Sequence, residues 1–151
     1  MKRFIPIDIV DVLVEKPYLL VDVLPKQVPA DSPGRYFAVA KYFSATMDTL
    51  CPKFAELLIR LNCYEELLVS KDGETWEADF APKDLVRYFT EVAKDHTPLF
   101  ILVRSADALF TFYGDEHYMT LYNPTDGLAD LVSQLAGAMG LFVWGSPSSF
   151  E

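Results

Sequence analysis

The side chains that could carry out catalysis or bind a metal ion are few and lie far apart along the chain. The sequence contains two cysteines, Cys51 and Cys63, and two histidines, His96 and His117. A structural zinc site needs clustered Cys or His ligands, and neither histidine has another histidine or a cysteine within one helical turn. Both cysteines stand beside apolar residues, which keep a thiol protonated and unreactive. We therefore predict no zinc site and no catalytic thiol–imidazole pair, and we interpret both cysteines as buried free thiols.

Other catalytic and ligand-binding motifs are missing from the sequence as well. Gly137 and Gly140 stand at the end of a predicted helix rather than after a strand, so they do not form a phosphate-binding loop. The consecutive residues Asp115, Glu116 and His117 could coordinate a divalent cation, but such a run is more typical of a solvated polar turn. We predict no catalytic residue, no cofactor and no metal ligand.

The composition is that of an acidic globular domain. Of the 151 residues, 51% are hydrophobic and 14% are aromatic, which is enough for a hydrophobic core and excludes global disorder. The formal net charge of −9 disfavours binding to nucleic acid or to anionic membranes, since both attract Lys and Arg. It fits either solubility alone or a basic protein partner. The length predicts one domain that covers residues 1–151.

We expect a cytoplasmic protein. Two cysteines do not make a disulfide framework in a chain of this length. The apolar run after the basic residues 1–3 is interrupted by Pro6, Asp8 and Asp11, so it lacks the continuous hydrophobic region of a signal peptide. No stretch reaches the roughly 18 apolar residues of a membrane-spanning helix.

Three helices are predicted from proline positions and apolar stripes. Pro52 and Pro82 each suit the first turn of a helix, where a missing N–H costs nothing. Asn123 is the predicted cap of a third helix, with Pro124 in its first turn and Gly140 after its end. The apolar residues at helical spacing are Phe54, Leu57, Leu58 and Leu61 in the first helix, Leu85, Val86, Phe89, Val92 and Ala93 in the second, and Leu128, Leu131, Val132, Leu135 and Met139 in the third.

The strands are predicted from alternation, apolar runs and turn residues. Residues 99–103 form an unbroken apolar run, which is typical of a strand covered on both faces. Residues 108–113 and 118–122 are expected to form a hairpin, and residues 141–144 a last strand. Together with the helices, these strands predict the α+β class: a largely antiparallel sheet of about five or six strands with helices packed on it.

A further turn is predicted at Asp72-Gly73, because this residue pair accepts positive φ. Residues 4–24 are ambiguous, since their apolar positions fit either a strand or a helix. Residues 25–34 are a proline-rich surface loop. A two-residue turn at Asp72-Gly73 would set Lys71 opposite Glu74, Val69 opposite Trp76 and Leu67 opposite Ala78.

The predicted hairpin of residues 108–122 separates two faces of different composition. One face carries Phe110, Phe112, Met119 and Leu121 and is predicted to be core. The other face is aromatic and rich in hydroxyl groups, a composition favoured where a protein meets a partner, and it ends in an acidic loop. The alternative is that a helix covers this face and the tyrosines line its edge. The candidate partner-binding residues are Thr111, Tyr113, Asp115, Glu116, Tyr118, Thr120 and Tyr122.

The last third of the chain is acidic throughout, because no Lys or Arg follows Arg104 whereas six carboxylates do. This charge, the α+β build, and the ending from residues 122–124 (Tyr-Asn-Pro) to residues 141–144 (Leu-Phe-Val-Trp) resemble small acidic bacterial immunity proteins of polymorphic or contact-dependent toxin systems. The resemblance implies stoichiometric inhibition of a toxin domain, often a basic nuclease, by an acidic surface.

The leading hypothesis is a non-catalytic protein-binding module, an immunity-type inhibitor that presents carboxylates and tyrosines to a basic partner. Two alternatives stay open. One is an enzyme or small-ligand-binding protein whose site is assembled from residues distant in sequence, and the other is a homo-oligomeric scaffold protein. A neighbouring toxin gene would favour the first hypothesis, and an operon of metabolic enzymes would favour the enzyme.

Overall fold

Six strands form one antiparallel sheet in the order β2-β3-β4-β5-β1-β6 in the computed structural model, which describes residues 5–114 and 116–145. The predicted α+β class with a largely antiparallel sheet is confirmed. Along the chain the elements are α1 (Ile9–Leu13), β1 (Tyr18–Asp22), α2 (Pro33–Ala45), α3 (Met47–Leu61), β2 (Leu67–Ser70), α4 (Pro82–Asp95), β3 (Pro98–Val103), β4 (Ala108–Tyr113), β5 (Tyr118–Tyr122), α5 (Asp126–Ala138) and β6 (Phe142–Gly145).

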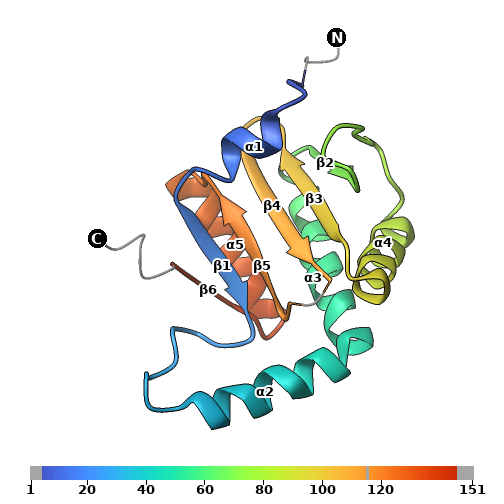
Figure 1. Ribbon diagram of the computed structural model, residues 1–151. Helices are drawn as coiled ribbons and strands as arrows, with labels where there is room; N and C mark the ends of the chain where they lie inside the picture. Colours follow the sequence, from blue (N-terminus) through green and yellow to red (C-terminus); the bar gives the residue numbers. More distant parts are fainter. Residues whose placement is uncertain (1–4, 115, 146–151) are drawn as a thin grey trace.

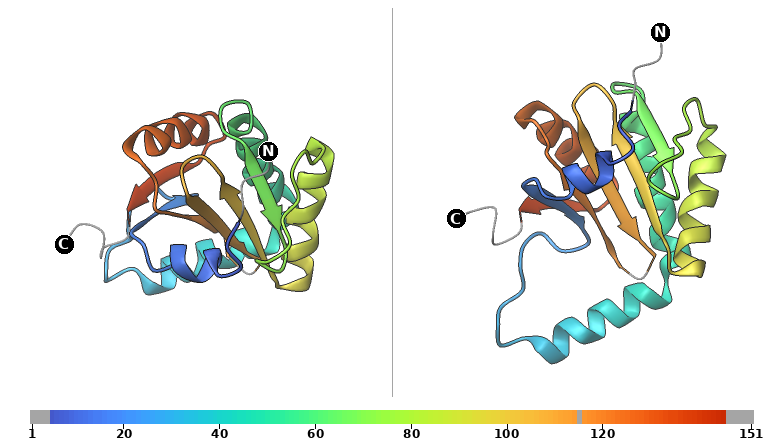
Figure 2. Two further views of the ribbon diagram at one scale, coloured as in Figure 1. Left: turned by 90° about the horizontal axis from the view of Figure 1, so that it is seen from above. Right: turned by 45° about the horizontal axis from the view of Figure 1, so that its top comes forward.

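Helices α3, α4 and α5 cover one side of the sheet, which we call the back face (Figures 1 and 2). Helices α1 and α2 lie on the other side, the front face, near opposite ends of the strands (Figure 1 and Figure 2, left). The main core fills the space between the back face and its three helices. Its largest side chains, which include Phe54, Phe89, Phe110 and Phe112, are all 0% exposed.

Several predicted elements are confirmed. Helix α4 begins at Pro82 and ends at Asp95. Strand β3 is buried on both faces, because Ile101 packs in the back core whereas Phe100 and Leu102 pack in a second cluster on the front. Strands β4 and β5 have the predicted bounds. The longest described helix, α3, has 15 residues, and none of the described helices is both long and apolar enough to cross a membrane.

The predicted start of the first apolar helix at Pro52 is wrong, because Pro52 lies inside α3. Helix α2 ends at Ala45, and α3 begins at Met47 after the non-helical Thr46 (φ −118°, ψ 34°). Proline within a helix forfeits one backbone hydrogen bond. The stripe that begins at Phe54 is buried as predicted, and its burial stabilises the helix more than the lost bond costs.

The predicted cap of the last helix is also wrong by two residues. Thr125 is the N-cap of α5, and its hydroxyl accepts a hydrogen bond from Leu128 N at 3.1 Å. Asn123 instead adopts a left-handed conformation (φ 61°), and its amide donates to Asp107 O at 3.0 Å. Asparagine suits both positions, so the residue type alone does not distinguish a cap from a left-handed turn. The end of α5 near Gly140 (φ 74°) agrees with the prediction.

The register predicted across Asp72-Gly73 is wrong by one residue. Val69 exchanges backbone hydrogen bonds with Glu77 (3.0 and 2.8 Å) rather than pairing with Trp76. The cause is a wider turn, in which the Asp72 carboxylate accepts hydrogen bonds from two backbone N–H groups beyond Gly73 (2.8 and 2.7 Å). A one-residue slip moves a side chain to the opposite face. Val69 therefore packs in the back core, and Trp76 packs with the front cluster.

Candidate interaction surface

The tyrosine-bearing side of the β4–β5 hairpin forms the middle of the front face. Thr111 lies directly opposite Thr120, and Leu109 lies directly opposite Tyr122. The same face continues onto β1, where Leu20 is opposite Thr120, and onto β6, where Trp144 is opposite Leu20. Because opposed residues share a face, one continuous surface crosses four strands.

The candidate residues differ greatly in how accessible they are to a partner. Thr111 and Thr120 are only 1% and 7% exposed, so they lie beneath the larger side chains around them. Tyr113 is 42% exposed and is the candidate most available for contact. Tyr118, Tyr122 and Glu116 are half-buried, and Asp115 lies outside the described residues. Phe142, which the sequence did not single out, is 44% exposed on the same face, opposite Asp22.

Helix α1 covers one end of the front face. Its buried Leu13 packs with Leu68, Leu102 and Leu109, and Tyr122 packs against this cluster. A helix therefore covers one part of the tyrosine-bearing face. The alternative interpretation of the sequence predicted that a helix covers the face as a whole. Among the helices of the described residues, none lies in front of the part between α1 and α2 (Figure 1).

A buried polar cluster joins the front face to α2. The His117 ring lies between Asp22 of β1 and two aromatic side chains of α2. Its Nε2 is 4.0 Å from an Asp22 carboxylate oxygen and 3.4 Å from the Tyr36 hydroxyl. Its ring stacks on Phe43 with centroids 6.4 Å apart. The Trp144 indole N–H donates to the other Asp22 oxygen at 3.3 Å. The solvated polar turn expected for residues 115–117 is therefore wrong for His117, which is 5% exposed.

Burial sets the protonation of this cluster. Loss of solvent raises the pKa of Asp22 and lowers the pKa of His117, and each charge opposes the shift of the other. A carboxylate beside an imidazole is a geometry found in general bases. Here the two side chains are each only 7% exposed, and the imidazole is in contact with Asp22, Tyr36 and Phe43. The cluster is therefore a structural connection between β1, β5, β6 and α2.

Helix α2, which borders the front face, was not predicted from the sequence. None of its described side chains, from Gly34 to Ala45, is fully buried, and Phe37 and Tyr42 are 69% and 63% exposed. Its half-buried residues are Tyr36, Val39, Ala40 and Phe43. Their spacing of i, i+3, i+4 and i+7, after Pro33 at the first helical position, is the signal that could have found this helix.

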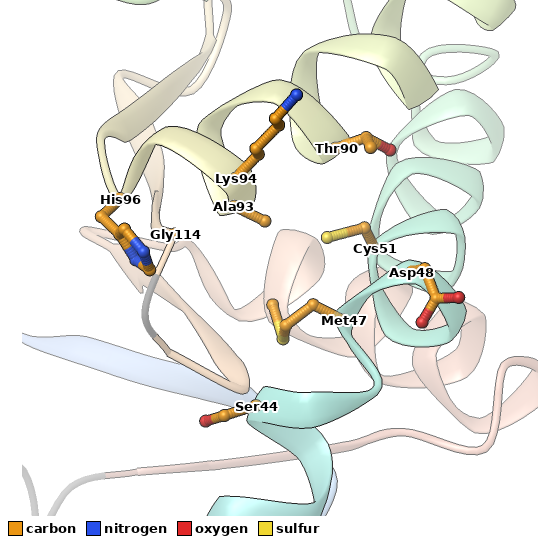
Figure 3. Close-up of a pocket in the computed structure, with 9 residues that line it drawn as sticks. All are labelled: Ser44, Met47, Asp48, Cys51, Thr90, Ala93, Lys94, His96 and Gly114. Atoms are coloured by element: carbon orange, nitrogen blue, oxygen red, sulfur yellow. The ribbon is translucent and has the colours of Figure 1, made fainter.

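A cavity of about 500 Å³ lies on the other side of the β4–β5 turn, between α3 and α4 (Figure 3). Cys51 contributes a thiol that is directed toward Ala93, while Asp48 and Lys94 extend away from the sulfur (Figure 3). The Cys51 thiol donates to Phe89 O at 3.6 Å. Burial raises the pKa of this thiol to about 11, so it is protonated at neutral pH and is a poor nucleophile. The cavity can admit a small molecule, but it does not assemble a catalytic group with Cys51.

The two cysteines should react with thiol reagents at very different rates. Cys51 is 1% exposed, whereas Cys63 is exposed at the end of α3, which corrects the prediction that both are buried. We expect the native protein to incorporate one equivalent of Ellman's reagent quickly, and a second only after unfolding. A Cys63→Ser variant should lose the fast phase alone. Two fast equivalents in the native wild-type protein would contradict the buried position of Cys51.

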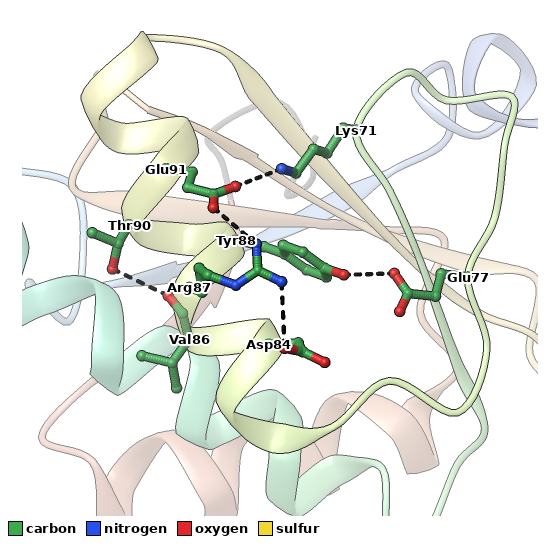
Figure 4. A network of polar contacts seen from close by, with 8 residues as sticks. All are labelled: Lys71, Glu77, Asp84, Val86, Arg87, Tyr88, Thr90 and Glu91. Atoms are coloured by element: carbon green, nitrogen blue, oxygen red, sulfur yellow. Dashed lines mark hydrogen bonds and ion pairs between the residues drawn. The ribbon is translucent and has the colours of Figure 1, made fainter.

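A network of ion pairs joins the segment after β2 to the outer side of α4 (Figure 4). The side chains are largely exposed, and pairs of this kind contribute little to stability. The network connects the residues around the Asp72-Gly73 turn to α4. The charged side chains that form it are paired with one another. Its contacts are Lys71–Glu91 (2.6 Å), Arg87–Glu91 (2.9 Å), Arg87–Asp84 (3.3 Å) and Tyr88–Glu77 (2.7 Å).

Comparison of the chain with protein-family models, with curated proteins and with solved structures gives no match. Within the described residues, no group of three or more His, Cys, Asp or Glu side chains is placed to hold a metal ion.

Proposed function

We propose that this chain is a non-catalytic protein-binding module, an immunity-type inhibitor that neutralises a basic toxin domain through its front face. The observation that carries the proposal is the placement of the exposed large hydrophobic side chains. In the described part of the chain all of them except Tyr64 belong to α2, to the front face, or to α1 and the residue Ile7 before it. Exposed apolar side chains gathered on one side of a protein are typical of an interaction site.

The charge of the chain supports a basic partner. A net charge of −9 creates a field that accelerates encounter with a basic protein and slows encounter with an acidic one. Aromatic residues such as Tyr113 and Phe142 are the side chains that most often supply affinity at the centre of such a contact.

The test is partner capture followed by binding kinetics. The wild-type protein is used as bait in an extract of its source organism, and the captured protein is purified and measured by surface plasmon resonance. We expect a basic partner whose association slows as salt rises, because steering acts over a Debye length of about 8–10 Å. Tyr113→Ala and Phe142→Ala should each speed dissociation about tenfold or more.

Tyr64→Ala is the matched control, because Tyr64 is 68% exposed but lies in the turn after α3, a helix of the back face. Its dissociation rate should equal that of the wild type. Equal effects of the Tyr64 and Tyr113 substitutions, or capture of an acidic partner only, would refute the front face as the binding site.

The cavity beside Cys51 favours a second candidate function, binding of a small apolar molecule. Its volume of about 500 Å³ is within the usual range for a ligand site. A thermal-shift screen of small molecules distinguishes the two functions: a hit abolished by Ala93→Phe, which fills the cavity, would support ligand binding and would leave the front face unaffected.

A further inference from the structure

The exposed side of α2 is basic in an otherwise acidic protein. Residues 26–45 hold Lys26, Arg35 and Lys41 but only one carboxylate, Asp31, whereas the whole chain has a net charge of −9. Arg35 and Lys41 are exposed beside Phe37 and Tyr42. At 100° per residue these side chains occupy the half of the helix opposite Tyr36 and Phe43, which contact His117. The outward side of α2 thus carries two exposed aromatic side chains and two cations.

The outward side of α1 has the complementary composition. Asp11 in this helix and Asp8 and Glu15 beside it are exposed, as are Val12, which is 45% exposed, and Lys16, which follows Glu15. Ile7, which precedes the helix, is 73% exposed. None of these three carboxylates, nor Arg35 or Lys41, has an ion-pair partner among the residues that the structure describes. The outward side of α1 thus carries exposed apolar side chains and a net negative charge, with three carboxylates and one cation, Lys16.

The two patches lie on the same side of the sheet, at opposite ends of the strands. In Figure 1, α1 is above and α2 is directly below it, and Figure 2 (left) shows both in front of the sheet. A twofold axis across the front face exchanges top and bottom and turns the two front faces toward each other. It therefore places α1 of one copy on α2 of the other, and does so twice, as an isologous contact requires.

We infer that the chain forms a homodimer through its front face. In this dimer the acidic outward side of α1 contacts the basic outward side of α2 from the second copy. A stable interface buries about 800 Å² on each partner, more than one 13-residue helix such as α2 offers. The two reciprocal helix contacts, with Tyr113 and Phe142 between them, supply the additional surface. Dimer formation covers the exposed apolar side chains of the front side, and the ion pairs fix the orientation of the two copies.

The dimer rests on the charge pattern of α1 and α2, and it does not depend on the proposed inhibitor function. If both hold, the dimer and the basic partner use the same face, and each excludes the other. The test of the dimer therefore contains no partner protein, so its failure is separate from a failure to capture a toxin domain.

The test uses charge reversal and sedimentation velocity of the purified chain over about 1–100 μM, a range that resolves micromolar association. We expect a concentration-dependent dimer for the wild type. Asp8→Lys with Asp11→Lys makes both patches basic, and Arg35→Glu with Lys41→Glu makes both acidic. Each double variant alone should dimerise at least about tenfold more weakly, because like charges then face each other at both contacts.

A mixture of the two double variants provides the decisive measurement. In a mixed dimer one contact keeps its original charges and the other has both signs reversed, so both contacts are attractive. We expect a 1:1 heterodimer from two variants that do not self-associate. Lys83→Glu with Lys94→Glu on α4 is the control, because it changes the net charge as much as Arg35→Glu with Lys41→Glu does. This control should dimerise as strongly as the wild type.

Three results would overturn the inference: a wild-type chain that stays monomeric throughout the range, double variants that dimerise like the α4 control, or a mixture that forms no heterodimer. All the substituted side chains are exposed. Circular dichroism checks that each variant is folded, and a Phe37→Asp variant, which changes a residue 69% exposed, tests the same contact if one double variant unfolds.

Discussion

Phe112→Ala should lower the free energy of unfolding by about 3–5 kcal/mol, the usual cost of removing a fully buried aromatic ring. The Phe112 side chain is 0% exposed on the back face of β4. Its ring centroid is 4.9 Å from that of Phe89 on α4 and 5.5 Å from that of Phe54 on α3. Truncation therefore leaves a cavity where the sheet meets two helices. Urea denaturation followed by circular dichroism measures the loss.

The neighbouring substitution Tyr113→Ala is the matched control, because consecutive residues of a strand face opposite sides. Tyr113 is 42% exposed on the front face, and its truncation should cost less than about 1 kcal/mol. Similar losses for Phe112→Ala and Tyr113→Ala would mean that Tyr113 is packed as tightly as the core. In that case it could not serve as a free contact residue for a partner.

Gly114→Ala should lower the free energy of unfolding by about 3 kcal/mol or more, at the upper end of overpacking costs. A Cβ atom at Gly114 would lie 2.0 Å from Val92 O and 2.9 Å from Ala93 Cα. These are backbone atoms of α4, so no side-chain rotation can relieve the clash. Gly114 N also donates to Thr97 O at 3.1 Å, which holds the turn in place. The substitution must separate the β4–β5 turn from α4 or distort the helix.

Gly127→Ala and Gly137→Ala in α5 are the controls, because a Cβ at either position meets no atom within 4 Å. Each should stabilise the protein by about 0.5–1 kcal/mol, since alanine is the better helix former. A neutral Gly114→Ala in the same denaturation series would contradict the close approach of the turn to α4.

The helices and strands whose residue pattern fits only one type of secondary structure could be predicted from the sequence. Strands β4 and β5 have their predicted bounds because Phe110 and Phe112 alternate with Thr111 and Tyr113, a period of two that fits a strand and not a helix. Helix α4 begins at Pro82 because the apolar stripe starts immediately after it. These segments place Tyr113 and its neighbours on one face.

The errors occurred where one residue type serves two structures. Proline is acceptable at a helix start and tolerated within a helix that is well packed, so Pro52 was assigned to the wrong position. Asparagine at position 123 was assigned as a cap although it occupies a left-handed turn. At Asp72 the side chain, rather than the backbone pair, sets the width of the turn. The Ser70 hydroxyl also donates to the Asp72 carboxylate at 2.9 Å, so local side-chain hydrogen bonds, which the residue pair does not reveal, widen the turn.

The candidate site was predicted only in part, because exposure depends on tertiary packing. The register of the hairpin predicts which residues share a face, but not that Thr111 and Thr120 are covered by larger neighbours. The burial of His117 needs Asp22 and Tyr36, which are 95 and 81 positions away and come from two other elements. Helix α2 escaped prediction because its apolar side is narrow and half-buried.

The break between α2 and α3 at Thr46 allows α2 to detach and unfold separately from the rest of the domain. Because α2 has no fully buried side chain in its described residues, detaching it costs less buried apolar surface than detaching a back helix, although it uncovers His117 and the half-buried Phe43. The backbone amides of α2 can therefore open to solvent exchange at a small fraction of the global unfolding energy. A protein that binds α2 favours the attached, folded form of this helix but does not stabilise the core. The surface formed by α2 can therefore open or change while the rest of the fold persists.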